Sequence, residues 1–127
     1  MIGSESKIFM FMGSILAAMG VVLGAFGAHA LKARLPSDLM AVYQTAVQYH
    51  LIHALGLFAV ACASVYLDSR VLVRWSGWTM FVGIIIFSGS LYALSMSGVR
   101  GFGAVTPVGG LAFILAWLLL AVAVWRG

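Results

Sequence analysis

The charged residues of this chain divide it into four long uncharged segments. Seven basic and three acidic residues occur in the 127-residue sequence, and the stretches between them cover residues 8–31, 39–67, 75–99 and 101–125. Each stretch is longer than the roughly 20 residues that an apolar helix needs to cross a hydrocarbon layer of about 30 Å. Because lipid cannot hydrogen-bond to the backbone, each stretch must be helical where it faces lipid. The sequence therefore predicts four transmembrane helices.

The composition supports the same prediction. Of all residues, 64% are hydrophobic and 8% are charged, whereas a soluble domain carries about 25% charged residues. A water-soluble fold of this size cannot hide so much apolar surface. We expect an all-α integral membrane protein with the lipid bilayer as its surroundings.

Two other interpretations fit less well. The motif Ala28-His29-Ala30 has the form of a signal-peptidase site, but the preceding apolar segment is longer than a signal-peptide core. The net charge of +4 does not indicate nucleic-acid binding, because the basic residues form no cluster. We interpret them as anchors at the membrane surface.

Short connections predict an up-down-up-down bundle that forms a single domain over residues 1–127. We place its helices at about residues 8–31, 42–67, 71–97 and 104–125, after a short polar tail. Ser37 or Asp38 is suited to cap the second helix. Pro107 suits the first turn of the last helix.

The basic residues also suggest an orientation. One side of the predicted bundle carries Lys7, Arg70, Arg74 and Arg126, and the other side carries Lys32, Arg34 and Arg100. Because cytoplasmic segments are enriched in basic residues, this difference favours cytoplasmic termini.

The first predicted helix has a seam of small residues. Gly13, Ala17, Gly20, Gly24 and Gly27 lie within about 80° of one another on a helix. In lipid, such seams allow close approach of two helices. The seam predicts a tight contact, with either a neighbouring helix or a second subunit. We therefore expect packing roles for these glycines and for Pro107 and Gly110, and self-association of the chain.

Polar residues gather in one half of the predicted membrane. The up-down topology brings together the end of the first helix, the start of the second, the end of the third and the start of the fourth. These parts contain the candidate ligand-binding residues His29, Gln48, Tyr49, His50, His53, Tyr92, Ser95, Arg100 and Thr106. The opposite half contains mostly aliphatic residues and tryptophans.

Helical angles indicate which of these residues meet. His50 and His53 share one face of the second helix, and Tyr92 and Ser95 share one face of the third. A polar group at membrane depth needs a partner. We therefore predict that His50 or His53 donates a hydrogen bond to Tyr92 or to a serine hydroxyl, which would lock the bundle.

Other functions for this half of the membrane remain open. His50 and His53 are spaced to hold a metal or haem, although His29 points about 180° from the glycine seam of its own helix. Recognition of a lipid headgroup or a quinone by His, Tyr, Ser and Arg is a further alternative. Proton-coupled transport is disfavoured because no carboxylate lies within a predicted span. We predict no catalytic residue and no bound cofactor.

Three motifs of the chain resemble a known family. They are LGAFGAHALK at residues 23–32, YQTAVQYHLIHAL at residues 43–55 and GFGAVTPVGG at residues 101–110. In order and spacing they resemble the YwdK/YgdD family of small uncharacterised membrane proteins, which often has Gly where this chain has Ala30. The resemblance implies a four-span protein of the bacterial plasma membrane, with no established activity or substrate. It highlights Gly24, Gly27, His29, Lys32, Gln48, Tyr49, His50, His53, Thr106, Pro107 and Gly110.

Overall fold

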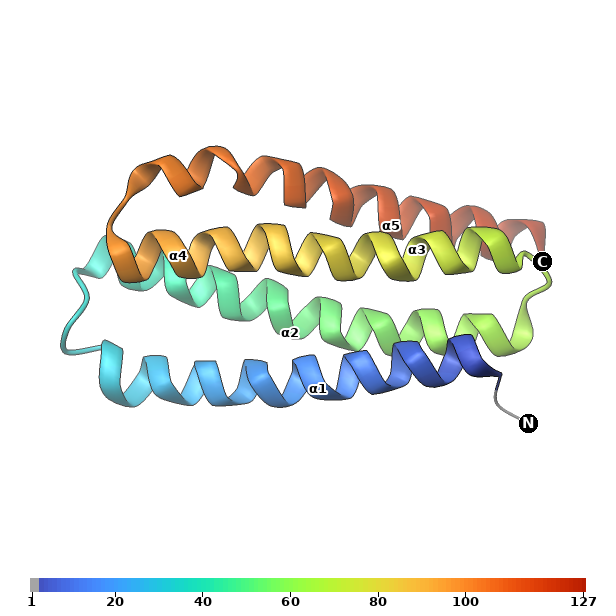
Figure 1. The fold of residues 1–127 in the computed structure, drawn as a ribbon, viewed down its shortest axis with the longest axis horizontal. Helices are drawn as coiled ribbons and strands as arrows, with labels where there is room; N and C mark the ends of the chain where they lie inside the picture. Colours follow the sequence, from blue (N-terminus) through green and yellow to red (C-terminus); the bar gives the residue numbers. More distant parts are fainter. Residues whose placement is uncertain (1–2) are drawn as a thin grey trace.

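The computed structural model describes residues 3–127 as a bundle of antiparallel helices (Figure 1). Its elements are α1 (Ser4–Phe26), η1 (Gly27–Leu31), α2 (Ser37–Tyr66), α3 (Arg70–Gly83), η2 (Ile84–Ser88), α4 (Gly89–Ser97), η3 (Arg100–Ala104) and α5 (Thr106–Arg126). The elements η1 and η2 are π-helical turns, and η3 is a 3-10 turn. No β-strand occurs among these described residues.

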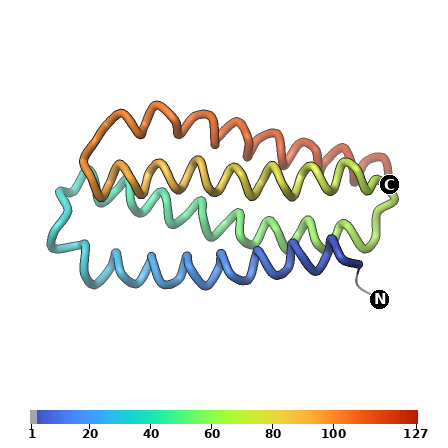
Figure 2. Tube along the Cα trace, in the orientation of Figure 1, coloured from blue at the N-terminus to red at the C-terminus, as the bar shows by residue number. Residues whose placement is uncertain are grey.

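These elements join into four helical stretches that are long and apolar enough to cross a membrane. Within residues 3–127 they are Ser4–Leu31, Ser37–Tyr66, Arg70–Ser97 and Arg100–Arg126. Successive stretches run in opposite directions, so that α1 begins and α5 ends at the same end of the bundle (Figure 2). The predicted all-α, up-down-up-down membrane bundle is confirmed.

Two helix starts differ from the sequence prediction. The first helix begins at Ser4, inside the segment predicted to be a polar tail, because Ser6 is buried and donates a hydrogen bond to the carbonyl oxygen of Ala61. The second helix begins at Ser37 and has no side-chain cap, so neither Ser37 nor Asp38 has the predicted capping role. Asp38 instead lies in the first turn, where the helix dipole favours a negative charge.

The third span ends at a glycine in the left-handed region. Gly98 has φ of 73°, and its N–H donates to the carbonyl oxygen of Leu94 at 2.8 Å. This conformation costs glycine nothing and terminates the helix. After η3, the last helix starts at Thr106, which places Pro107 in its first turn as predicted.

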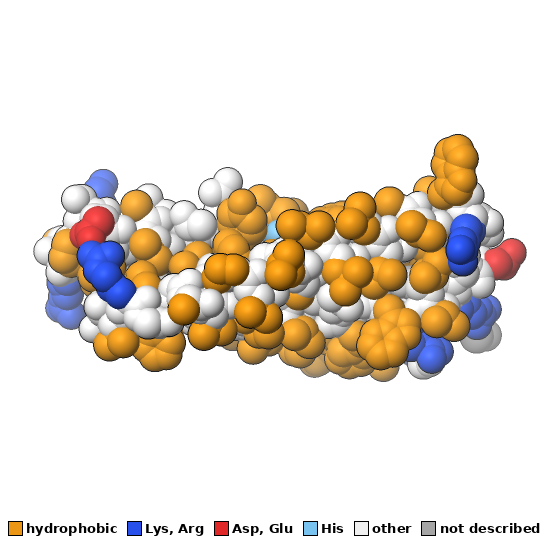
Figure 3. Space-filling model, turned by 90° about the horizontal axis from the view of Figure 1, so that it is seen from above, with side chains coloured by type: hydrophobic (Ala, Val, Ile, Leu, Met, Phe, Trp, Pro, Cys, Tyr) orange, Lys and Arg blue, Asp and Glu red, His pale blue; other side chains and the backbone are white. Residues whose placement is uncertain are grey.

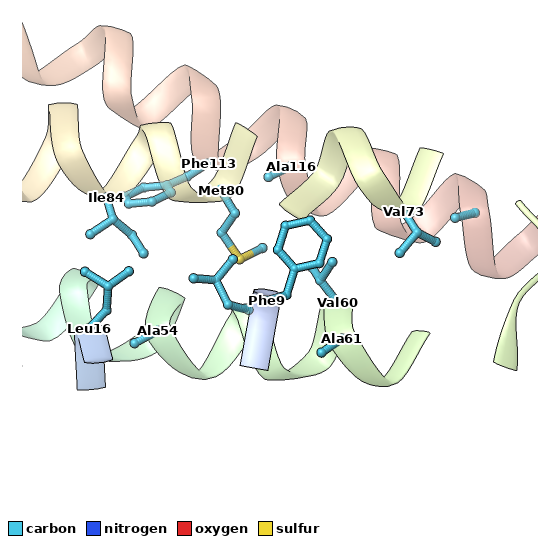
Figure 4. Close-up of a cluster of buried hydrophobic side chains, with 12 residues drawn as sticks. Phe9, Leu16, Ala54, Val60, Ala61, Val73, Met80, Ile84, Phe113 and Ala116 are labelled. Atoms are coloured by element: carbon cyan, nitrogen blue, oxygen red, sulfur yellow. The ribbon is translucent and has the colours of Figure 1, made fainter. Parts of the chain in front are cut away.

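The hydrophobic core lies along the middle of the bundle. Phe9 from α1, Met80 from α3 and Phe113 from α5 point into this region (Figure 4). Gly56 of α2 leaves room for Met80, because a Cβ there would lie 2.6 Å from the sulfur atom. Charged side chains gather at the two ends, and the surface between them is largely hydrophobic (Figure 3). This distribution matches a helical bundle in a bilayer.

The glycine seam of α1 packs against α2 of the same chain. A Cβ on Gly13 would lie 2.9 Å from the carbonyl oxygen of Ala54, and a Cβ on Gly20 would lie 2.5 Å from the Leu51 side chain. A Cβ on Gly27 would collide with a tyrosine ring of α2. The neighbouring helix, one of the two partners that the sequence left open, therefore packs against this seam.

The close contact of α5 involves a different glycine from the predicted one. A Cβ on Gly109 would lie 2.7 Å from the Cα of Phe87 in η2, whereas a Cβ on Gly110 would make only an ordinary contact at 3.8 Å with the Phe87 ring. Gly109 is therefore the position where α5 approaches the backbone of the third span.

Candidate functional site

His50 joins three helices through both of its ring nitrogens. The residue is 2% exposed; its Nε2 lies 2.7 Å from the carbonyl oxygen of Leu16, and its Nδ1 lies 2.8 Å from the hydroxyl of Tyr92. A carbonyl oxygen can only accept, so Nε2 carries the hydrogen and Nδ1 accepts from the Tyr92 O–H. Of the predicted contacts of the two histidines with Tyr92 or a serine hydroxyl, the one between His50 and Tyr92 is present, but the tyrosine is the donor.

His53 forms a second contact, with α5. Its Nδ1 donates to the carbonyl oxygen of Tyr49 at 2.7 Å, and its Nε2 accepts from the indole N–H of Trp117 at 3.0 Å. The ring stacks on Phe113 with centroids 3.5 Å apart. Trp117 and Phe113 were not singled out in the sequence, because nothing in its pattern reveals which face of α5 meets α2.

These hydrogen bonds leave neither histidine a free nitrogen. Each ring is a neutral tautomer with one donated and one accepted hydrogen bond, so a metal would have to displace an existing partner. His29 is exposed on η1 and does not join them. Among residues 3–127, no cluster of three or more His, Cys, Asp or Glu side chains is arranged to hold a metal.

Further polar side chains bond to backbone carbonyls of neighbouring helices. The hydroxyls of Ser76 and Ser88 donate to Ala116 and Ala46 at 2.7 and 2.8 Å. Tyr43 donates in the same way to Leu23. A carbonyl in a helix has a second lone pair, so it can accept such a bond without giving up its own. Each bond therefore ties two helices together.

Two of these contacts lie in the half of the bundle that was predicted to be mostly aliphatic. Ser6 in the first turns of α1 and Ser76 near the start of α3 are both buried. Sequence reasoning missed them, because a serine in an apolar helix looks the same whether it bonds within its own helix or across to another.

The remaining predicted residues are distributed over separate places. Ser95 is buried and donates to the carbonyl oxygen of Tyr92 in its own helix at 3.0 Å. Thr106 shares a hydrogen bond with Ser90 across α4 and α5. Arg100 forms an exposed ion pair with Asp38 at 3.3 Å at the end of the bundle. Most of the predicted polar residues thus lie in separate contacts, whereas Gln48, Tyr49 and His53 line a common recess.

One recess beside these contacts opens on the outer surface of the bundle. It has a volume of about 530 Å³, and we call it the α2–α5 recess; its walls include Gln48, Tyr49, His53, Phe87, Phe113 and Trp117. The ring of Tyr49 lies 4.6 Å from that of Phe87. Gln48 and Tyr49 are exposed, and none of the hydrogen bonds among residues 3–127 engages the Gln48 amide or the Tyr49 hydroxyl.

The fold and these contacts define a small polytopic α-helical membrane protein whose buried polar residues join its helices. Residues 23–110 match a family model described as "Protein of unknown function (DUF423)", and the chain belongs to this family. The family resemblance predicted from the three motifs is thereby confirmed.

Relatives match nearly the whole chain. It is 49% identical over 117 residues to the UPF0382 membrane protein YwdK of Bacillus subtilis. The matched region covers 92% of this chain and 95% of the relative. It is 41% identical over 120 residues to the UPF0382 membrane protein SH2409 of Staphylococcus haemolyticus. Here the matched region covers 94% of this chain and 97% of the relative. No solved structure matches the chain.

Proposed function

We propose that this protein binds an amphiphile of the quinone class in the α2–α5 recess. A quinone has a planar ring with carbonyl oxygens and an apolar tail. The recess offers aromatic side chains for the ring, and its volume of about 530 Å³ lies within the range of small-molecule sites. It opens toward the hydrocarbon layer, which would accommodate the tail.

The observation that carries the proposal is the pair of unpartnered polar groups at membrane depth. The helix α2 has 30 residues, so it is about 45 Å long and extends about 7 Å beyond each side of the hydrocarbon layer. Gln48 and Tyr49 then lie about 10 Å inside that layer. Polar groups there are costly without a partner. Their N–H and O–H donors suit the carbonyl oxygens of a quinone.

His53 supports the site without contacting the ligand through a nitrogen. Both nitrogens of its ring are already bonded to Tyr49 and Trp117. Its ring is fixed between neighbours and forms part of the wall. We assign it a positioning role for Tyr49.

Fluorescence quenching of Trp117 by decylubiquinone tests the proposal in detergent micelles. The chain has four tryptophans. We expect a saturable component of quenching in the native chain, which Trp117→Phe removes while the unsaturable quenching of the other tryptophans stays. Tyr49→Phe deletes only a hydroxyl and should weaken binding about fivefold, the equivalent of one hydrogen bond. Tyr66→Phe is the matched control, because Tyr66 is 84% exposed near the other end of α2. Equal binding by both tyrosine variants would contradict the proposal.

Self-association was predicted from the glycine seam, and the seam gives it no support because α2 occupies it. A second copy that covers the recess would also satisfy Gln48 and Tyr49. The same purified sample distinguishes the two cases: a dimer mass in native mass spectrometry, with no quinone quenching, would favour the second copy.

We further propose that the protein resides in a bacterial plasma membrane with both termini in the cytoplasm. Its relatives are bacterial membrane proteins. The end with the termini carries Lys7, Arg70, Arg74 and Arg126, against Lys32, Arg34 and Arg100 at the other end. Fusions of alkaline phosphatase and of a fluorescent protein to Arg126 test the orientation, since the phosphatase is active only outside the cytoplasm.

A further inference from the structure

A second recess lies between α2 and α1. It has a volume of about 210 Å³, and we call it the α1–α2 groove; its walls include Gly24, Gly27, Ala28, Tyr43, Gln44 and Val47. Unlike the tighter glycines of the seam, Gly24 is open: a Cβ there would meet only Val47, at an ordinary 3.4 Å. The groove therefore has space for an apolar chain along α1.

The groove has a polar side chain, Gln44, in its wall at a defined depth. Gln44 is exposed in its wall and lies about 3 Å inside the hydrocarbon layer by the helix geometry used above. The glycerol esters of a phospholipid lie just outside this depth, within reach of the Gln44 side chain. None of the hydrogen bonds among the described residues engages the Gln44 amide.

A basic residue, Lys32, lies near the outer end of the groove. Lys32 continues the helical backbone of η1, with φ of −56° and ψ of −36°, so that it lies about one turn beyond Ala28 toward the membrane surface. Lys32 and Arg34 are both exposed, and neither forms an ion pair with any residue of 3–127. The nearest acidic position in the sequence, Asp38, pairs with Arg100.

From this sequence of groups we infer that the α1–α2 groove binds one anionic phospholipid. Its acyl chain lies against Gly24, the Gln44 amide donates to a glycerol ester carbonyl, and its phosphate pairs with Lys32. The order of apolar, amide and cationic groups matches the order of the same lipid from tail to headgroup. The two recesses share Gln48 as a wall residue. The inference does not rest on the proposed quinone site, because Gly24, Gln44 and Lys32 do not line the α2–α5 recess.

Native mass spectrometry with added phosphatidylglycerol or phosphatidylcholine of identical acyl chains tests the inference. We expect one retained phosphatidylglycerol, preferred about fivefold over phosphatidylcholine, because a basic side chain near an anionic surface contributes about that factor. Lys32→Gln should remove the preference. Arg70→Gln makes the same charge change at the opposite end and should keep it. No preference in the native chain, or equal effects of the two variants, would overturn the inference.

A pair of glycine variants tests the groove itself. A Cβ at Gly24 meets only Val47, at 3.4 Å, so Gly24→Leu places its side chain in the groove, and retention of both lipids should fall. Gly89→Leu is the control, because Gly89 is exposed on α4 with no atom within 4 Å of a Cβ. Equal retention by the two variants would exclude the groove as the lipid site. If the native chain retains the phospholipid but shows no saturable quenching by the quinone, only the proposed quinone binding would be refuted.

Discussion

A double-mutant cycle on His50 and Tyr92 measures the buried contact that joins α2 to α1 and α4. His50→Leu removes two cross-helix hydrogen bonds, to Leu16 and to Tyr92. Such bonds average about 0.6 kcal/mol each in membrane proteins. The stranded Tyr92 hydroxyl adds about 1 kcal/mol, whereas the Leu16 carbonyl keeps its own helical bond. The expected loss is about 2 kcal/mol.

The other two corners of the cycle follow from the same contacts. Tyr92→Phe removes one bond and leaves Nδ1 of His50 without a donor, a loss of about 1.5 kcal/mol. The double variant lacks both bonds but strands no buried group, so its loss is only about 1.2 kcal/mol. The two single effects therefore exceed the double effect by about 2 kcal/mol, which is a coupling within the usual range for residues in contact.

Unfolding by SDS in mixed micelles, followed by circular dichroism, gives the four free energies. Tyr66→Phe serves as the control, since the exposed Tyr66 hydroxyl has no bond to lose. If the effects of His50→Leu and Tyr92→Phe add to within about 0.5 kcal/mol, the two side chains do not interact in the way described.

Two further variants test other contacts by the same titration. Gly109→Ala places a Cβ against the Phe87 backbone and should destabilise the bundle by about 2 kcal/mol, whereas Gly110→Ala should change it by less than about 0.5 kcal/mol; equal effects would contradict the close approach at Gly109. Trp117→Phe removes the donor to His53 and should cost about 1 kcal/mol, and an unchanged midpoint would mean that this bond contributes nothing.

The architecture was predictable because lipid restricts the choices of the chain. Uncharged stretches of sufficient length must be helices, and short loops make them antiparallel. The same topology brings the second and third spans together, so helical angles narrowed the contact to His50 or His53 with Tyr92 or a serine hydroxyl, and His50 with Tyr92 is the pair that forms. Its direction was not predictable, because it depends on the Leu16 carbonyl, which no sequence pattern identifies.

Contacts that depend on the rotation of a whole helix were not predictable. Gly109 and Gly110 differ by about 100° around α5, and only the placement of η2 decides which of them meets Phe87. The π-helical turns themselves left no sequence signal. The candidate site was likewise only partly foreseen: Gln48, Tyr49 and His53 were named, but the walls supplied by Phe87, Phe113 and Trp117 were not.

In the hydrogen bonds to backbone carbonyls, only one of the two residues must be of a particular type. Ser76 must keep its hydroxyl, but its acceptor at Ala116 is a peptide group that every amino acid provides. The same asymmetry holds for His50 and the Leu16 carbonyl. Replacing the acceptor residue by another that fits the space leaves the bond in place. Pairs of positions joined in this way will not vary together among relatives, so covariation between sequences will miss the contacts that hold this bundle together.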